Sequence, residues 1–143
     1  MKTKLAFGIA ALGMVLASVP AIAHHSFAAE FDSNKPIKLT GSVTKIEWMN
    51  PHAYFYIDVT DAAGKVTNWG LEMGSPNGLM RQGWTRNSMK IGDTINVQGS
   101  LAKDGSNLAN ARTVKLSDGR RLFAGSASET GREETPGEKK GGQ

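Results

Sequence analysis

Apolar residues recur at every second position through the middle of the chain, and this spacing limits what the chain can fold into. The clearest run covers residues 53–59, where the two faces alternate in the order Ala53, Tyr54, Phe55, Tyr56, Ile57, Asp58 and Val59. A period of two places alternate side chains on opposite faces of a β-strand, whereas a helix requires a spacing near 3.6. We therefore predict a strand with its apolar residues facing inward and its tyrosines and aspartate facing outward.

Four further segments carry a similar signal, and one helix interrupts them. Residues 39–48 are β-rich, but their alternation slips between Val43 and Ile46, as a β-bulge would cause. Residues 66–73 follow a tight turn at 61–64, and residues 94–99 and 110–116 form the later strands. Between the third and fourth segments, Ser75 supplies an N-cap and Pro76 the first helical position, which predicts a helix of no more than two turns.

The order of three strands, a short helix and two strands is the layout of an OB-fold. We predict a mostly β fold, a small five-stranded OB-like barrel with one short helix between strands 3 and 4, over residues 24–123. Its core is expected to contain Phe55, Ile57, Val59, Trp69, Leu71, Ile95, Val97 and Val114.

The two ends of the chain differ from this domain in composition. Residues 1–23 contain Lys2 and Lys4, an uncharged apolar run over 5–19, and the small-residue sequence Ala21-Ile22-Ala23. This order is typical of a secretory signal peptide, and the apolar run is short for a membrane span. We expect a mature protein that begins at His24 and is periplasmic or secreted from a bacterium. Residues 124–143 are polar and are expected to form a disordered tail.

Charge argues against one class of partner. The chain has 17 basic and 13 acidic residues, and removal of Lys2 and Lys4 lowers the formal net charge from +4 to +2. No stripe of lysine and arginine with interleaved aromatic residues is present. We therefore expect no nucleic-acid partner, and no stable membrane anchor after processing.

The three histidines suggest a metal site. His24 and His25 would stand at the new N-terminus, and cleavage before His24 would free an α-amino group that chelates together with its own imidazole. A third nitrogen from His52 would complete a histidine brace, and amine and imidazole nitrogens in tetragonal geometry suit Cu(II). His25 offers a competing mode through the N-terminal amine, its own deprotonated backbone amide and its imidazole. The sequence lacks cysteine, so no thiolate competes for the metal.

His52 precedes the strongest strand in a loop that Pro51 stiffens. Water, Asp58, Glu72 or a tyrosine could complete a copper site there. The alternative is that His52 only hydrogen-bonds the turn, as a lone surface histidine often does. As an alternative function, a non-metal binding module could present Asn50, Tyr54, Tyr56 and Asp58 to a periplasmic protein or an oligosaccharide, since OB-like barrels bind ligands on the face of strands 2 and 3.

No catalytic residues are predicted. The serines lie in no nucleophile motif, and the segment 74–78 has neither the spacing nor the lysine of a phosphate-binding loop. Asp58 and Glu72 have no spacing that would define an acid/base pair. The sequence therefore favours a binding protein over an enzyme and leaves the question of a catalytic activity open.

Several segments resemble a family of small exported bacterial proteins of unknown function. They are the His-His-Ser-Phe sequence at 24–27, the Trp-x-Asn-Pro-His-Ala sequence at 48–53, and the later segments 68–69, 74–77, 83–84, 103–106 and 122–123. The resemblance covers nearly the whole expected mature domain. It implies export and a compact β-rich domain, and it implies no reaction.

Overall fold

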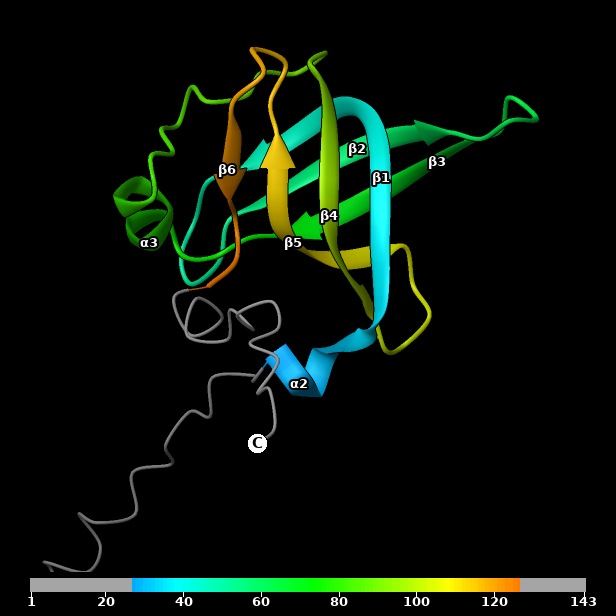
Figure 1. The fold of residues 1–143 in the computed structure, drawn as a ribbon, viewed down its shortest axis with the longest axis horizontal. Coiled ribbons are helices and arrows are strands. Elements are labelled where there is room, and N and C mark those ends of the chain that lie inside the picture. The colour runs from blue at the N-terminus through cyan, green and yellow to red at the C-terminus, as the bar shows by residue number, and fades with distance from the viewer. Residues whose placement is uncertain (1–26, 127–143) are drawn as a thin grey trace, which may run out of the picture.

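The structure, a computed structural model, describes residues 27–126. Within this range the chain forms two short helices and six strands (Figure 1). In chain order they are α2 (Phe27–Glu30), β1 (Phe31–Glu47), β2 (Tyr54–Thr60), β3 (Val66–Glu72), α3 (Pro76–Arg81), β4 (Thr94–Ala102), β5 (Leu108–Lys115) and β6 (Arg121–Phe123). No helix among these residues is long and apolar enough to cross a membrane.

The first five strands close into a barrel. They follow the order β3-β2-β1-β4-β5, and a parallel pairing of β3 with β5 joins the two ends of this sheet. All other pairings are antiparallel, and β6 adds to the free edge of β5. With α3 between the third and fourth strands, this topology confirms the predicted OB-like barrel.

The strand β1 pairs with β4 along its first part and with β2 along its second part, so it contributes to two sides of the barrel (Figure 1). Its register with β2 shifts between Val43 and Lys45, where the slipped alternation predicts a bulge. A bulge bends a strand and increases its twist, which helps a single strand to turn the corner of a small barrel.

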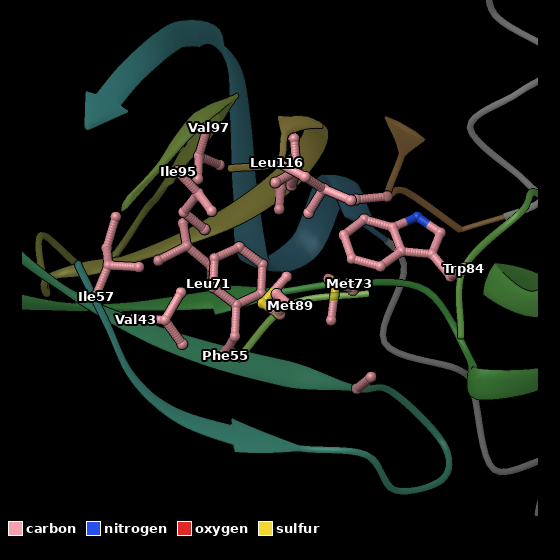
Figure 2. Packing of buried hydrophobic residues seen from close by; sticks show 14 of the residues in the cluster. Val43, Phe55, Ile57, Leu71, Met73, Trp84, Met89, Ile95, Val97 and Leu116 are labelled. Carbon is pink, nitrogen blue, oxygen red and sulfur yellow. The ribbon is translucent and has the colours of Figure 1, made fainter. Parts of the chain in front are cut away.

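The barrel is filled by the apolar face that the alternation predicts. Phe55, Ile57 and Leu71 are fully buried, and Figure 2 shows the ring of Phe55 among the side chains of the opposite wall. Ile95, Val97 and Val114 are also buried, whereas Val59 and Trp69 are only partly buried at the edge of the cluster. Trp84, which follows α3, is 2% exposed and its indole N–H donates to the carbonyl of Phe123 at 2.7 Å.

Some boundaries differ from the expected ones. β1 begins at Phe31 rather than at residue 39, because the polar segment that follows Phe31 pairs with β4 without a regular apolar alternation. The sixth strand β6 was not among the five expected, since three residues are too few for a periodic signal. The packed chain extends past Phe123 to Ala124, which is fully buried and donates its N–H to the carbonyl of Arg112 at 2.8 Å.

Candidate functional site

The outward face of β2 lies between β1 and β3 and carries both tyrosines of the chain. Tyr54 is paired with Glu47 on β1 and Glu72 on β3, and Tyr56 is paired with Lys45 and Gly70. Asp58, the next outward position, is paired with Ser42 and Asn68. We call this surface the tyrosine face and define it by Lys45, Glu47, Tyr54, Tyr56, Asp58, Asn68, Gly70 and Glu72.

One end of the tyrosine face forms a hydrogen-bonded cluster of three side chains. Nδ1 of His52 lies 2.5 Å from Oε1 of Glu72, and the hydroxyl of Tyr54 donates to Oε2 of Glu72 at 2.5 Å. The Glu72 side chain is only 5% exposed, whereas a third of the His52 side chain (33%) is exposed. A buried carboxylate therefore lies behind a histidine that remains open to solvent.

The backbone holds these three residues together. Tyr54 and Glu72 are directly opposite on neighbouring antiparallel strands, where side chains on one face are within contact distance. Ala53, which follows His52, accepts a hydrogen bond from Met73 at 2.8 Å and donates one to Gly74 at 3.1 Å. The residues that adjoin His52 and Glu72 are thus bonded to each other, which fixes the imidazole beside the carboxylate.

The environment of Tyr54 raises the pKa of its hydroxyl from an ordinary value of 10.0, first because the ring is partly buried and then because Glu72 accepts its proton in a hydrogen bond. The charges of Glu72 and Glu30 act in the same direction. Tyr54 therefore remains a protonated donor to Glu72 at neutral pH.

α2 carries Glu30, whose charge contributes to the raised pKa of Tyr54. The segment is anchored from two sides. Phe31 is 2% exposed, and its ring packs against that of Phe27 with a centroid separation of 5.7 Å. Lys103 donates its backbone N–H to the carbonyl of Glu30 at 2.9 Å and its ammonium to the carbonyl of Ala28 at 2.5 Å.

The other end of the tyrosine face has a different arrangement. The hydroxyl of Tyr56 donates to Glu47 at 3.0 Å, and Lys45 forms an ion pair with Glu47 at 2.5 Å. The Lys45 ammonium also lies 5.0 Å from the centre of the Tyr56 ring. Partial burial, followed by the bond to Glu47, raises the pKa of Tyr56. Glu47 is therefore neutralised by a lysine, in contrast to Glu72.

Asp58 and Asn50 are the two remaining members of the predicted surface. Asp58 accepts a hydrogen bond from the side-chain amide of Asn68 at 2.8 Å. It is six positions after His52, roughly 20 Å along an extended chain, so the two side chains do not share one ion. Asn50 is exposed in the loop before His52, and its peptide bond to Pro51 is cis.

The metal site predicted from the histidines is only partly within the described range. His24 and His25 lie outside the described residues, and His52 is inside them. Among residues 27–126, no three histidine, cysteine, aspartate or glutamate side chains form a cluster that could hold a metal ion. Glu72 is one of the additional ligands that the sequence suggests, but one of its oxygens accepts a hydrogen bond from Tyr54 and the other lies 2.5 Å from Nδ1 of His52. The described residues thus provide one open imidazole and the carboxylate behind it.

The comparison with protein families assigns the chain. Residues 11–111 match the family described as a family of unknown function, DUF6152. The chain belongs to this family. No curated protein matches the chain. The resemblance to a family of unknown function is thereby confirmed, whereas export stays a prediction.

Solved structures with a similar fold are distant from this DUF6152 protein. The mitochondrial single-stranded DNA binding protein Rim1 of S. cerevisiae is 8% identical, with a TM-score of 0.46 over 57% of this chain and 92% of Rim1. The N-terminal domain of PriB from Thermoanaerobacter tencongensis is 15% identical, with a TM-score of 0.42 over 59% of this chain and 97% of that domain. A ZRD-deleted mutant of TiaS in complex with agmatine is 22% identical, with a TM-score of 0.41 over 59% of this chain and 22% of TiaS. At these scores the likeness says nothing about a ligand.

Proposed function

We propose that this protein is exported and binds one Cu(II) ion through His52 and the mature N-terminus. In this site, the α-amine and imidazole of His24 provide two nitrogens and the imidazole of His52 provides the third. His25 is the competing ligand, through the N-terminal amine, its own deprotonated backbone amide and its imidazole. Three nitrogen donors of this kind favour Cu(II) over the other divalent first-row metals.

The observation that carries this proposal is the buried carboxylate of Glu72. Its side chain is 5% exposed, and no lysine or arginine among residues 27–126 forms an ion pair with it. Burial of a carboxylate is costly unless hydrogen bonds and a positive charge compensate it. A cation bound to the far side of His52 would supply that charge through the imidazole, and histidines that bind metals usually donate their other N–H to such a carboxylate.

The position of α2 is consistent with the second half of the site. The anchored segment 27–30 carries Glu30, whose charge contributes to the raised pKa of Tyr54, and Tyr54 is itself bonded to Glu72. Phe27 is three positions after His24, and an extended segment of that length spans at most about 11 Å. A mature N-terminus at His24 would therefore remain within about 11 Å of the start of α2.

The signs of the charges also favour a cation. Three carboxylates, those of Glu47, Asp58 and Glu72, lie on the tyrosine face against the single ammonium of Lys45. A surface with this excess of negative charge attracts a metal ion and repels a polyanion such as nucleic acid.

The test is a copper titration of protein whose N-terminus is His24, verified by intact mass. It is compared with a form that carries one additional N-terminal residue, with His52→Ala and with His25→Ala. We expect tight one-to-one binding that is lost in the extended form and weakened by His52→Ala. Dependence on His25 together with indifference to His52→Ala would assign the metal to a simple terminal chelate, and equally weak binding by all forms would refute a copper site.

A second function is favoured by the other end of the tyrosine face. The ring of Tyr56 lies over Gly70, where an added Cβ would come within 3.4 Å of Cε1 of the ring, so no side chain covers it from β3. A partly exposed tyrosine ring of this kind suits the non-metal binding module for a periplasmic protein or an oligosaccharide. This function would be supported if chelators leave partner capture unchanged while Tyr56→Ala abolishes it.

A further inference from the structure

We propose that Glu72, held in place by Tyr54, fixes the tautomer of His52 and so makes Nε2 the nitrogen that receives the cation. This role deepens the proposed copper site and rests on it, but the tautomer itself is a property of the metal-free protein. Glu72 acts here as a positioning residue, because it would touch the ligand His52 and not the metal.

The hydrogen bonds of Glu72 determine where the proton of His52 lies. The hydroxyl of Tyr54 donates to one carboxylate oxygen, and the other oxygen lies 2.5 Å from Nδ1 of His52. An ionised carboxylate has only acceptor oxygens, so the hydrogen of this second contact comes from Nδ1. Nδ1 must therefore carry the hydrogen of the neutral imidazole, and the lone pair that can bind a metal is on Nε2.

The fold restricts this arrangement to one geometry. Glu72 is at the end of β3, where it is paired with Tyr54 on one side and with Asn110 of β5 on the other. The hydroxyl of Tyr54 holds the second oxygen, which leaves the carboxylate little freedom to rotate away from His52. On the other side of the pair, the backbone bonds of Ala53 to Met73 and Gly74 fix the start of β2. The backbone is therefore fixed on both sides of the contact between His52 and Glu72.

The tyrosine face provides a matched control for substitutions of Glu72. Tyr56 donates to Glu47 as Tyr54 donates to Glu72, and each of these hydrogen bonds joins β2 to a neighbouring strand. Glu47 contacts Lys45 rather than a histidine. Glu47→Gln therefore removes a carboxylate charge from the same surface without touching the tautomer of His52.

The experiment measures the ring nitrogens of His52 by 1H–15N correlation in metal-free protein, in alkaline buffer where the ring is neutral. The native protein and Glu47→Gln are expected to show the Nδ1–H tautomer. In Glu72→Gln the amide can donate or accept, and in Glu72→Asp the shorter side chain withdraws the oxygen. Both changes should shift the ratio of tautomers toward Nε2–H by about tenfold, and Tyr54→Phe should shift it in the same direction by less.

Copper titration of the same variants completes the test. Loss of a partner of this kind typically weakens metal binding about 10–100-fold, so Glu72→Gln and Glu72→Asp should lose affinity in that range while Glu47→Gln does not. An unchanged tautomer in folded Glu72→Gln or Glu72→Asp would overturn the inference whether or not copper binds. A shifted tautomer with unchanged copper affinity would overturn the positioning role. A shifted tautomer in a protein that never binds copper would instead reject the copper function and retain the tautomer assignment.

Discussion

The bond between Tyr54 and Glu72 should contribute measurably to the stability of the barrel. Tyr54→Phe removes one hydroxyl and leaves Oε2 of Glu72 without its donor, in a side chain that is 5% exposed. A hydrogen bond to a charged group contributes about 1.5–3 kcal/mol, and the loss is largest when the remaining partner is buried. We expect a decrease of about 2 kcal/mol in the free energy of unfolding.

The matched substitution is Tyr56→Phe, which also removes a hydroxyl that donates to a glutamate on the same face. Glu47 is more exposed, at 24% of its side chain, and it retains its ion pair with Lys45. Water can replace the lost donor at Glu47, so Tyr56→Phe should cost clearly less than Tyr54→Phe. Both variants keep the aromatic ring, so the difference between them reports the buried carboxylate rather than packing.

The assay is urea unfolding of metal-free protein, followed by tryptophan fluorescence. The free energy of unfolding falls by about 1–3 kcal/mol per molar urea, so a loss of about 2 kcal/mol in this free energy moves the unfolding midpoint by roughly 1 M. Equal midpoints for Tyr54→Phe and Tyr56→Phe would refute the reasoning, because they would show that the Glu72 carboxylate is as well solvated as that of Glu47. If the slope of the free energy of unfolding against urea concentration differed between the variants, the substitution would have changed the compactness of the unfolded or native state instead.

Three further predictions concern the core, the β4–β5 pairing and alkaline pH. Phe55→Ala should cost about 3–5 kcal/mol in urea unfolding, because Phe55 is fully buried, and a cost near zero would place it outside the core. Gly99→Ala should cost at least about 1–3 kcal/mol by the same assay, since an added Cβ would lie 1.7 Å from the carbonyl oxygen of Asn110; an unchanged midpoint would contradict this register. Because the pKa of Tyr54 is raised in the native state, the folded protein keeps the phenol proton at a pH where the unfolded chain has lost it. The stability that Tyr54 contributes is therefore present below pH 10.0 and is lost as the pH rises above it. The native protein should therefore lose more stability than Tyr54→Phe between about pH 9 and 11, and parallel losses would contradict the assignment.

The alternation of apolar residues was sufficient to predict the barrel because its strongest strand is regular. Phe55 and Ile57 face inward as their spacing requires, and the capped start of α3 at Ser75 and Pro76 follows from local chemistry alone. The first part of β1 could not be predicted in the same way. Its polar residues gain strand geometry from hydrogen bonds to β4, a partner far away in sequence.

The contact between His52 and Glu72 depends on the register of β2 against β3, which composition and periodicity do not predict. The side chains are 20 residues apart, and they meet only because β2 and β3 pair so that Tyr54 is opposite Glu72. A signal for this register does exist in the turn. Asp61 donates its N–H to the carbonyl of Lys65, and its carboxylate accepts from the backbone N–H of Ala63. A turn that pairs Asp61 with Lys65 sets the register of the whole hairpin, and in this register Tyr54 is opposite Glu72.

The location of Glu72 links the candidate site to the closure of the barrel. Glu72 is the last residue of β3, and its pairing with Asn110 is the last of the three pairs in the parallel ladder that joins β3 to β5. The carboxylate that orients His52 is therefore held by the same contacts that close the sheet on itself. A change that opens this ladder should disturb His52 without touching it, and a cation bound by His52 only in the closed barrel should stabilise that closure by mass action.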